Sequence, residues 1–198
     1  RIRHSLPDEA GRIPRLPDHV KVGIVDSLYL NFHYYFSWKP PSPDWTFDIL
    51  DTTFHQQTSQ PSESLWSRIH WVVTARKSNM AEAYVGILHS QEKIKSRDVL
   101  ATILAELIEM HETSMEKIKI ITPLDSPAHR ILQGAFTVIL LPESQVGEKS
   151  LWVISVLPRN QLAYVIIGKT HEKSYPLVKN DLEKCVRHYS AISRSIFE

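Results

Sequence analysis

Cysteine and glycine are scarce in this sequence, and each scarcity excludes a class of site. Among 198 residues there is one cysteine, Cys185, so neither an intramolecular disulfide nor a cysteine-rich zinc site can form within the chain. The six glycines form no G-x-x-x-x-G-K-S/T or G-x-G-x-x-G pattern, and no G-x-S-x-G elbow is present. These absences argue against nucleotide hydrolysis, dinucleotide redox chemistry and a serine nucleophile of the elbow type.

An excess of charge of one sign is also lacking. Lys+Arg 23 against Asp+Glu 22 leaves a formal net charge of +1, too small to draw the chain generally onto phosphate backbones or anionic lipid. The longest apolar runs, such as 136–142 and 151–158, have strand length and fall far short of the roughly 20 residues that cross a bilayer. We therefore expect no nucleic-acid partner, and membrane contact only through an anchor that preceded Arg1.

The first twenty residues differ in composition from the rest. They contain three prolines and charges of both signs but no apolar period, as is typical of a segment without a core of its own. We expect 1–20 to be a flexible arm or linker and 21–198 to be one domain. Within the arm, Arg12 and Arg15 are candidate contacts to a partner, and the alternative is a solvated linker.

The remaining chain divides into short apolar runs bounded by turn residues. Two runs, 69–77 and 81–90, are joined by a short polar turn and predict an antiparallel hairpin, in which Ile69, Trp71 and Val73 share one face. The last three strands are almost continuously apolar, which indicates that both of their faces are covered. Further strands are expected over 34–39, 44–51, 117–123, 129–142, 150–158 and 161–170.

Two segments have the apolar period of amphipathic helices. One is expected over 97–112 after an N-cap at Ser96, and the other over 176–195, where Pro176 suits a first helical turn. The predicted fold class is therefore α+β: a mainly antiparallel, twisted sheet sandwiched between two amphipathic helices.

Aromatic residues concentrate in 32–49, around a proline-rich corner at 40–43. Aromatic residues in strands usually fill a core, and the alternative is a platform that stacks a ligand. The start Phe36-Ser37-Trp38-Lys39-Pro40-Pro41 with Pro43 and Trp45, the order of elements, and the ending at 192–196 together resemble the Mog1/PsbP-like fold group. On this interpretation 32–49 is the first hairpin of the sheet, and its prolines protect the sheet edge.

That group includes PsbP-domain proteins of photosynthetic membranes, Ran-binding Mog1 proteins, bacterial lipoproteins and small chaperones of the same shape. The resemblance covers about residues 32–197. Because the sequence contains no recognisable catalytic set, we expect a non-enzymatic binding or assembly factor with a protein partner and no cofactor, like the exported members of this group. The resemblance to these members favours an exported location, in a periplasm, cell envelope or thylakoid lumen, over the cytoplasm. The alternatives are a metal-dependent or other hydrolase built from dispersed His, Asp and Glu, and a chaperone for apolar helices.

The residues themselves suggest few sites. The ten histidines form no H-x-H or H-E-x-x-H pair, so no metal ligand is assigned, although His70 could meet His89 across the predicted hairpin. Cys185 lies on the apolar stripe of the last helix, where a buried, inert thiol is expected. Glu106 is expected on the solvent side of the first helix. Five histidines lie in or next to predicted strands: His33, His70, His89, His129 and His171.

The loop 52–64 is the second candidate for partner binding. It is polar, rich in Gln and Ser, and flanked by Phe54 and Trp66. Aromatic side chains on loops beside a rigid sheet are common binding sites. The sequence therefore predicts partner contacts at Phe54 and Trp66, besides Arg12 and Arg15, and no catalytic residue.

Overall fold

The computed structural model describes residues 14–55, 64–122, 134–142, 148–187 and 189–192. Its strands are β1 (Val22–Val25), β2 (Leu28–Asn31), β3 (Phe36–Trp38), β4 (Thr46–Ile49), β5 (His70–Lys77), β6 (Ala81–His89), β7 (Lys119–Thr122), β8 (Ala135–Pro142), β9 (Lys149–Arg159), β10 (Leu162–His171) and β11 (Tyr189–Ala191). Its helices are α1 (Ser96–Met110) and α3 (Tyr175–Arg187), with 3-10 turns η1 (Trp66–Arg68), η2 (Met115–Lys117) and η3 (Glu172–Ser174). No helix in these ranges is long and apolar enough to cross a membrane.

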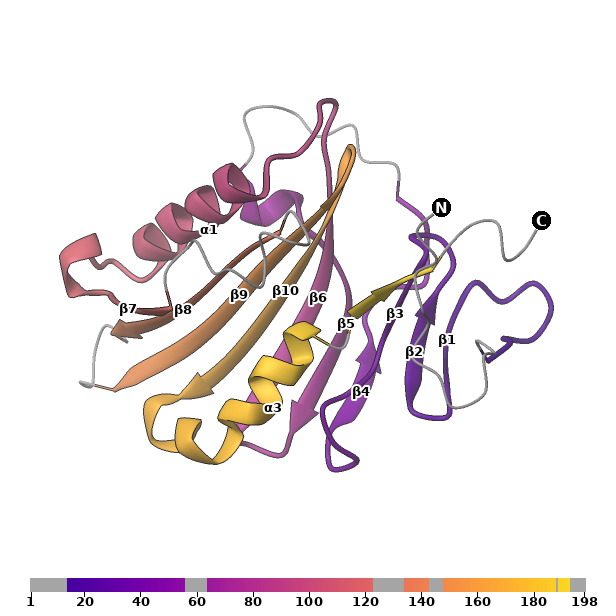
Figure 1. Ribbon diagram of the computed structural model, residues 1–198, viewed down its shortest axis with the longest axis horizontal. Helices are drawn as coiled ribbons and strands as arrows, with labels where there is room; N and C mark the ends of the chain where they lie inside the picture. Colours follow the sequence, from indigo (N-terminus) through magenta and orange to yellow (C-terminus); the bar gives the residue numbers. More distant parts are fainter. Residues whose placement is uncertain (1–13, 56–63, 123–133, 143–147, 188, 193–198) are drawn as a thin grey trace, which may run out of the picture.

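The strands form two antiparallel sheets (Figure 1). The large sheet has the order β4-β5-β6-β10-β9-β8-β7, and the small sheet has the order β1-β2-β3-β11. Helix α1 packs on one face of the large sheet, against β8 and β9, and α3 packs on the other, against β10, β9 and β6. The structure thus confirms the predicted α+β class and adds a second sheet to it.

Burial on both faces explains the apolar composition of the central strands. Along β9, Ile154 belongs to the core under α1, while Val153 belongs to the core under α3. At Gly168 of β10, an added Cβ would lie 2.8 Å from Leu182 Cδ2, so glycine permits the close approach of α3. The prediction of central strands covered on both faces is confirmed for β9 and β10.

The aromatic residues Tyr34, Phe36, Trp38 and Trp45 belong to the core, as expected, but the stretch 32–49 is not a hairpin. Strand β3 pairs with β2 and β11 in the small sheet, whereas β4 pairs with β5 in the large one. The proline-rich corner therefore carries the chain from one sheet to the other. Trp38 is fully buried and Trp45 is 4% exposed, and the Trp38 indole donates to the Cys185 carbonyl at 2.8 Å.

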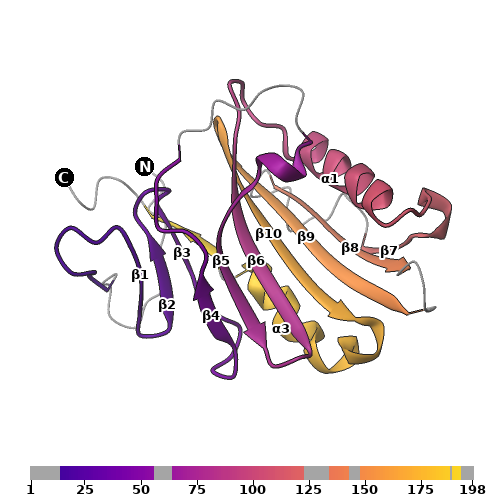
Figure 2. The same cartoon turned by 180° about the vertical axis from the view of Figure 1, so that it is seen from behind.

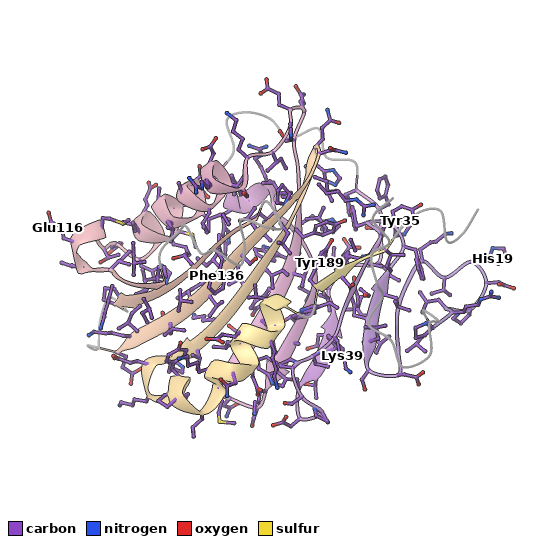
Figure 3. All side chains as sticks on the ribbon, viewed as in Figure 1. His19, Tyr35, Lys39, Glu116, Phe136 and Tyr189 are labelled. Atoms are coloured by element: carbon purple, nitrogen blue, oxygen red, sulfur yellow. The ribbon has the colours of Figure 1, made fainter. Side chains whose placement is uncertain are left out.

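The predicted C-terminal end of the second helix, at residue 195, was wrong. It stops at Arg187, and the chain continues as strand β11, which pairs with β3. In this conformation the Tyr189 ring, labelled in Figure 3, lies 4.7 Å from that of Tyr164 and 5.7 Å from that of Phe36. The apolar residues continue at helical spacing beyond Arg187, but this spacing does not make the segment helical. Pairing with the distant strand β3 determines its conformation.

Three local expectations also need correction. A bulge in β5 between Trp71 and Val73 places Trp71 toward the α1 core and Val73 toward the α3 core, so these residues do not share a face. Helix α1 begins at Ser96 itself, with Lys95 at the N-cap position. Glu106 is not a solvent-side carboxylate: it accepts hydrogen bonds from the backbone of η1.

The expected boundary between arm and domain stays a prediction, because residues 1–13 lie outside the described part. Residues 14–20 contain neither helix nor strand. Leu16 in this segment lies against Gly23 of β1.

An ion pair between Lys77 at the end of β5 and Asp181 of α3 should make stability sensitive to acid. Burial acts to raise the pKa of Asp181, but hydrogen bonds from Lys77 Nζ (2.8 Å) and Trp45 Nε1 (3.1 Å) outweigh it and hold this pKa below its ordinary value. Because the pKa of Asp181 is lower in the folded state, its carboxylate stabilises the fold at pH values above the ordinary aspartate pKa, near pH 4. That stabilisation is lost as the pH falls through the folded-state pKa.

Replacing Asp181 by asparagine should therefore flatten the acid limb of the stability curve. Urea unfolding between about pH 5 and pH 2 should show a smaller loss of stability for Asp181→Asn than for the parent protein. Asp48→Asn is the matched control, since Asp48 is exposed on β4. Equal slopes for all three proteins would contradict this role of Asp181.

Candidate functional site

Three tryptophans gather on the face of the large sheet that carries α1. The Trp66 ring lies 5.5 Å from that of Trp71 and 6.2 Å from that of Trp152. Figure 2 shows that α1 crosses β8 and β9 and leaves β5 and β6 uncovered on this face. The tryptophans therefore stand at the border between the covered and the open half of the sheet.

They line a pocket of about 270 Å³, which we call the tryptophan pocket. Its lining is mainly apolar, and its charged members are Glu82 and Lys169. The Lys169 ammonium lies 5.1 Å from the centre of the Trp152 ring, within the range of a cation–π contact. Among the residues that the structure describes, the lining is Leu50, Trp66, Trp71, Glu82, Tyr84, Trp152, Ile167 and Lys169.

The pocket walls are fixed by neighbours from distant parts of the chain. Glu106 of α1 accepts hydrogen bonds from the backbone N–H groups of Leu65 (2.6 Å) and Trp66 (2.7 Å), which holds η1 against the helix. The Trp152 indole donates to Ser150 Oγ at 2.9 Å. A pocket whose walls are held in this way needs little ordering when a ligand enters.

The polar groups of the tryptophan pocket are few among the described residues. The described lining includes no histidine, cysteine or serine, and its carboxylate, Glu82, accepts a hydrogen bond from the Tyr84 hydroxyl at 2.8 Å. Burial, followed by the interaction with Glu82, raises the pKa of Tyr84, so its phenol stays protonated. The pocket can enclose an apolar group and offers charge of both signs at its edge.

A second, polar cluster lies where β4 ends and β5 begins. Asp51 Oδ2 is 2.9 Å from His70 Nε2 and 3.1 Å from His55 Nε2. Hydrogen bonds from the Thr53 hydroxyl and backbone N–H, and then from His70, hold the pKa of Asp51 well below its usual range. We call Asp51, His55 and His70 the histidine cluster; these three are the described residues that could hold a metal ion.

The predicted site residues fall in different places. Trp66 lines the tryptophan pocket, whereas Phe54 is 49% exposed beside the histidine cluster, with its ring 5.5 Å from that of Tyr34. Arg15 is exposed, and Arg12 lies outside the described residues. Partner contacts at these four positions stay predictions.

The histidines considered from the sequence also separate. His70 joins Asp51 and His55 instead of His89. The His89 ring contacts Tyr34 at 5.8 Å, and burial, followed by the nearby His70, lowers the pKa of His89. His33 lies beside Phe54, His171 is exposed at the end of β10, and His129 is outside the described residues. Cys185 is buried as expected, and burial raises the pKa of its thiol.

Sequence reasoning missed several site residues. Trp71 and Trp152 resemble core residues because each sits in an apolar strand, and the bulge in β5 that helps turn Trp71 to the α1 face has no clear signature. Asp51 and His55 are four residues apart, but the chain between them is coil. Their link to His70 depends on the pairing of β4 with β5.

Comparison with known proteins concerns the fold. A scan against protein-family models finds no match, and a search among curated proteins finds none. Among solved structures, the chain is similar to a protein from Bacteroides thetaiotaomicron, with 10% sequence identity and a TM-score of 0.43, over 81% of this chain and 46% of that one. This chain thus spans less than half the length of that protein.

It is also similar to the Ran-binding protein Mog1p of Saccharomyces cerevisiae. This match has 9% identity and a TM-score of 0.46, and it covers 83% of this chain and 94% of Mog1p. Mog1 proteins belong to the fold group that the order of elements in the sequence resembles. The match is one of fold alone and not of activity or partner.

Proposed function

We propose that this protein is a non-enzymatic protein-binding domain that takes an apolar side chain of a partner's extended segment into the tryptophan pocket. The observation that carries the proposal is the open, mainly apolar pocket between Trp66, Trp71 and Trp152. Aromatic pockets of this kind are where partner side chains anchor most of the binding energy of an interface. A role as an assembly factor at an exported location, which the resemblance implies, is part of the proposal.

The size of the pocket favours a side chain over a whole small molecule. Its volume of about 270 Å³ is below the roughly 300–1,000 Å³ of pockets that enclose drug-sized ligands. The same size argues against a chaperone for apolar helices, which needs a groove that accepts several turns.

The surroundings of the pocket favour a peptide. Leu50, which lines the pocket, is 47% exposed, so apolar surface is open to a partner at the edge of the pocket. Glu82 and Lys169 provide one acceptor and one donor of opposite charge at the edge, which suits an uncharged backbone with both N–H and C=O groups. A strongly anionic or cationic ligand would find no matching excess of charge.

Peptide selection tests this proposal. Phage-displayed random peptides would be selected on the parent protein alone, and the enriched peptides would then be measured against Leu50→Lys, which places a charge in the pocket lining. We expect enriched peptides to share an aromatic or aliphatic residue, and their affinity to fall about tenfold or more for Leu50→Lys.

Leu177→Lys is the matched control, because Leu177 is 75% exposed on α3 and not among the residues that line the pocket. It should bind the selected peptides like the parent protein. Selection of peptides that bind the parent and Leu50→Lys equally well would contradict the proposal.

A further inference from the structure

The histidine cluster has the spacing of metal ligands. Its three ligating atoms lie within 4.8 Å of one another, and Asp51 Oδ2 is 2.9 Å from one imidazole nitrogen and 3.1 Å from the other. In a tetrahedral zinc site with bonds of about 2.0–2.2 Å, neighbouring ligand atoms are about 3.3 Å apart. The two carboxylate–imidazole distances are close to that value.

Hydrogen bonds from neighbouring groups orient Asp51 and His70, the two less exposed members of the cluster. The Asp51 carboxylate uses its other oxygen, Oδ1, to accept hydrogen bonds from the Thr53 N–H (2.8 Å) and hydroxyl (2.7 Å), which leaves Oδ2 directed at the imidazoles. The His70 ring is held through Nδ1, which lies 3.2 Å from the Tyr34 hydroxyl. Such outer hydrogen bonds are the usual means by which proteins fix the orientation of ligands at a metal.

The Tyr34 hydroxyl links the two histidines. It accepts a hydrogen bond from the His55 backbone N–H at 3.0 Å while it contacts His70 Nδ1. When His70 carries its proton on Nδ1 and donates to Tyr34, its Nε2 lone pair faces the Asp51 carboxylate, and a cation between them relieves the repulsion of two acceptors.

Access from solvent is open on one side. The side chain of His70 is 11% exposed, that of Asp51 29% and that of His55 51%. Three protein ligands with a solvent-facing side leave a fourth position for water, as in zinc sites that are not closed structural sites. Two imidazoles and one carboxylate suit Zn²⁺ better than Mg²⁺ or Ca²⁺, which prefer oxygen ligands alone.

We propose that Asp51, His55 and His70 bind one Zn²⁺ ion, oriented by Thr53 and Tyr34. This site goes beyond the proposed peptide binding, since the residues that line the tryptophan pocket include no member of the histidine cluster. The other state of the cluster is a hydrogen-bonded network in which protons occupy the gaps between Asp51 and the two rings.

Calorimetric titration distinguishes the two states. The untagged, chelator-treated protein would be titrated with ZnCl₂, and we expect about one ion bound per chain. Co²⁺ used in place of zinc should give the visible absorption of a four- or five-coordinate ion, which reports nitrogen and oxygen ligation directly.

Variants assign the site. His55→Gln and His70→Gln should each weaken zinc binding by about tenfold or more, and Tyr34→Phe by about tenfold through loss of orientation. His171→Gln is the matched control, because His171 is exposed and lies outside the cluster. Since His55 is half-exposed, His55→Gln should keep the melting temperature of the zinc-free parent and so report binding alone.

Two results would overturn the proposal. One is the absence of zinc binding by the parent protein, which would leave the proton-linked network as the state of the cluster. The other is binding that His55→Gln and His70→Gln leave unchanged. Neither result affects the peptide-binding proposal, which is tested with Leu50→Lys.

Discussion

Replacement of Trp45 by alanine should lower the free energy of unfolding by about 3–5 kcal/mol. Trp45 is 4% exposed and belongs to the core on the α3 side of the large sheet. Its indole also donates to Asp181 Oδ2 at 3.1 Å, and Lys77 Nζ lies 2.8 Å from the same oxygen. Alanine would thus leave a large cavity and remove one of the two donors that hold this carboxylate.

Urea unfolding measures the effect, and a second variant separates its two parts. Trp45→Phe keeps an aromatic ring but removes the N–H, so its loss should be smaller than that of alanine, with about 1 kcal/mol attributable to the hydrogen bond. Leu177→Ala, on the exposed surface of α3, should change stability by no more than about 0.5 kcal/mol. If Trp45→Ala also cost less than about 0.5 kcal/mol, the indole would not be a core residue and the ligand-platform interpretation would return.

Gly86→Ala should destabilise the protein by about 1–3 kcal/mol through overpacking. A Cβ at this position of β6 would lie 2.3 Å from Ile69 Cγ2 and 2.8 Å from Trp71 Cε3. Ile69 immediately precedes β5, and Trp71 of β5 pairs with Gly86. Trp71 is also a wall of the tryptophan pocket. The substitution should therefore also move the Trp71 ring and weaken binding of the selected peptides.

Denaturant unfolding and near-ultraviolet circular dichroism would follow stability and the tryptophan environment together. Gly23→Ala is a suitable comparison, because its Cβ would meet the end of one flexible side chain, Leu16 Cδ2, at 2.7 Å. It should cost less than Gly86→Ala. Unchanged stability and an unchanged tryptophan spectrum in Gly86→Ala would contradict the packing of Trp71 over Gly86.

Local patterns predicted the elements whose partners are close in the sequence. The β5–β6 hairpin joins neighbouring strands through a short turn, and α1 shows its apolar stripe over four turns, so both were found. The sequence could not show that β3 and β4 enter different sheets, because the proline-rich corner is compatible with a hairpin. Strand β11 was missed because its partner, β3, lies about 150 residues earlier in the chain.

The candidate sites were less predictable than the fold. Trp66 was found because it follows a polar loop, but the tryptophans that face it come from β5 and β9 and have the composition of core. The histidine cluster needs the β4–β5 pairing to bring Asp51 and His70 within 2.9 Å. In both sites the residues that meet are far apart in the chain, and no local pattern in the sequence predicts their contacts.

The most direct test of the peptide-binding account is a nuclear magnetic resonance titration that resolves the indole N–H signals of the five tryptophans. N-acetylleucinamide, a capped apolar side chain, is the probe. We expect the signals of Trp66, Trp71 and Trp152 to move with its concentration, while the core residues Trp38 and Trp45 stay unchanged. Shifts confined to Trp38 and Trp45, or no shift of the three pocket signals at millimolar probe, would contradict binding in the tryptophan pocket.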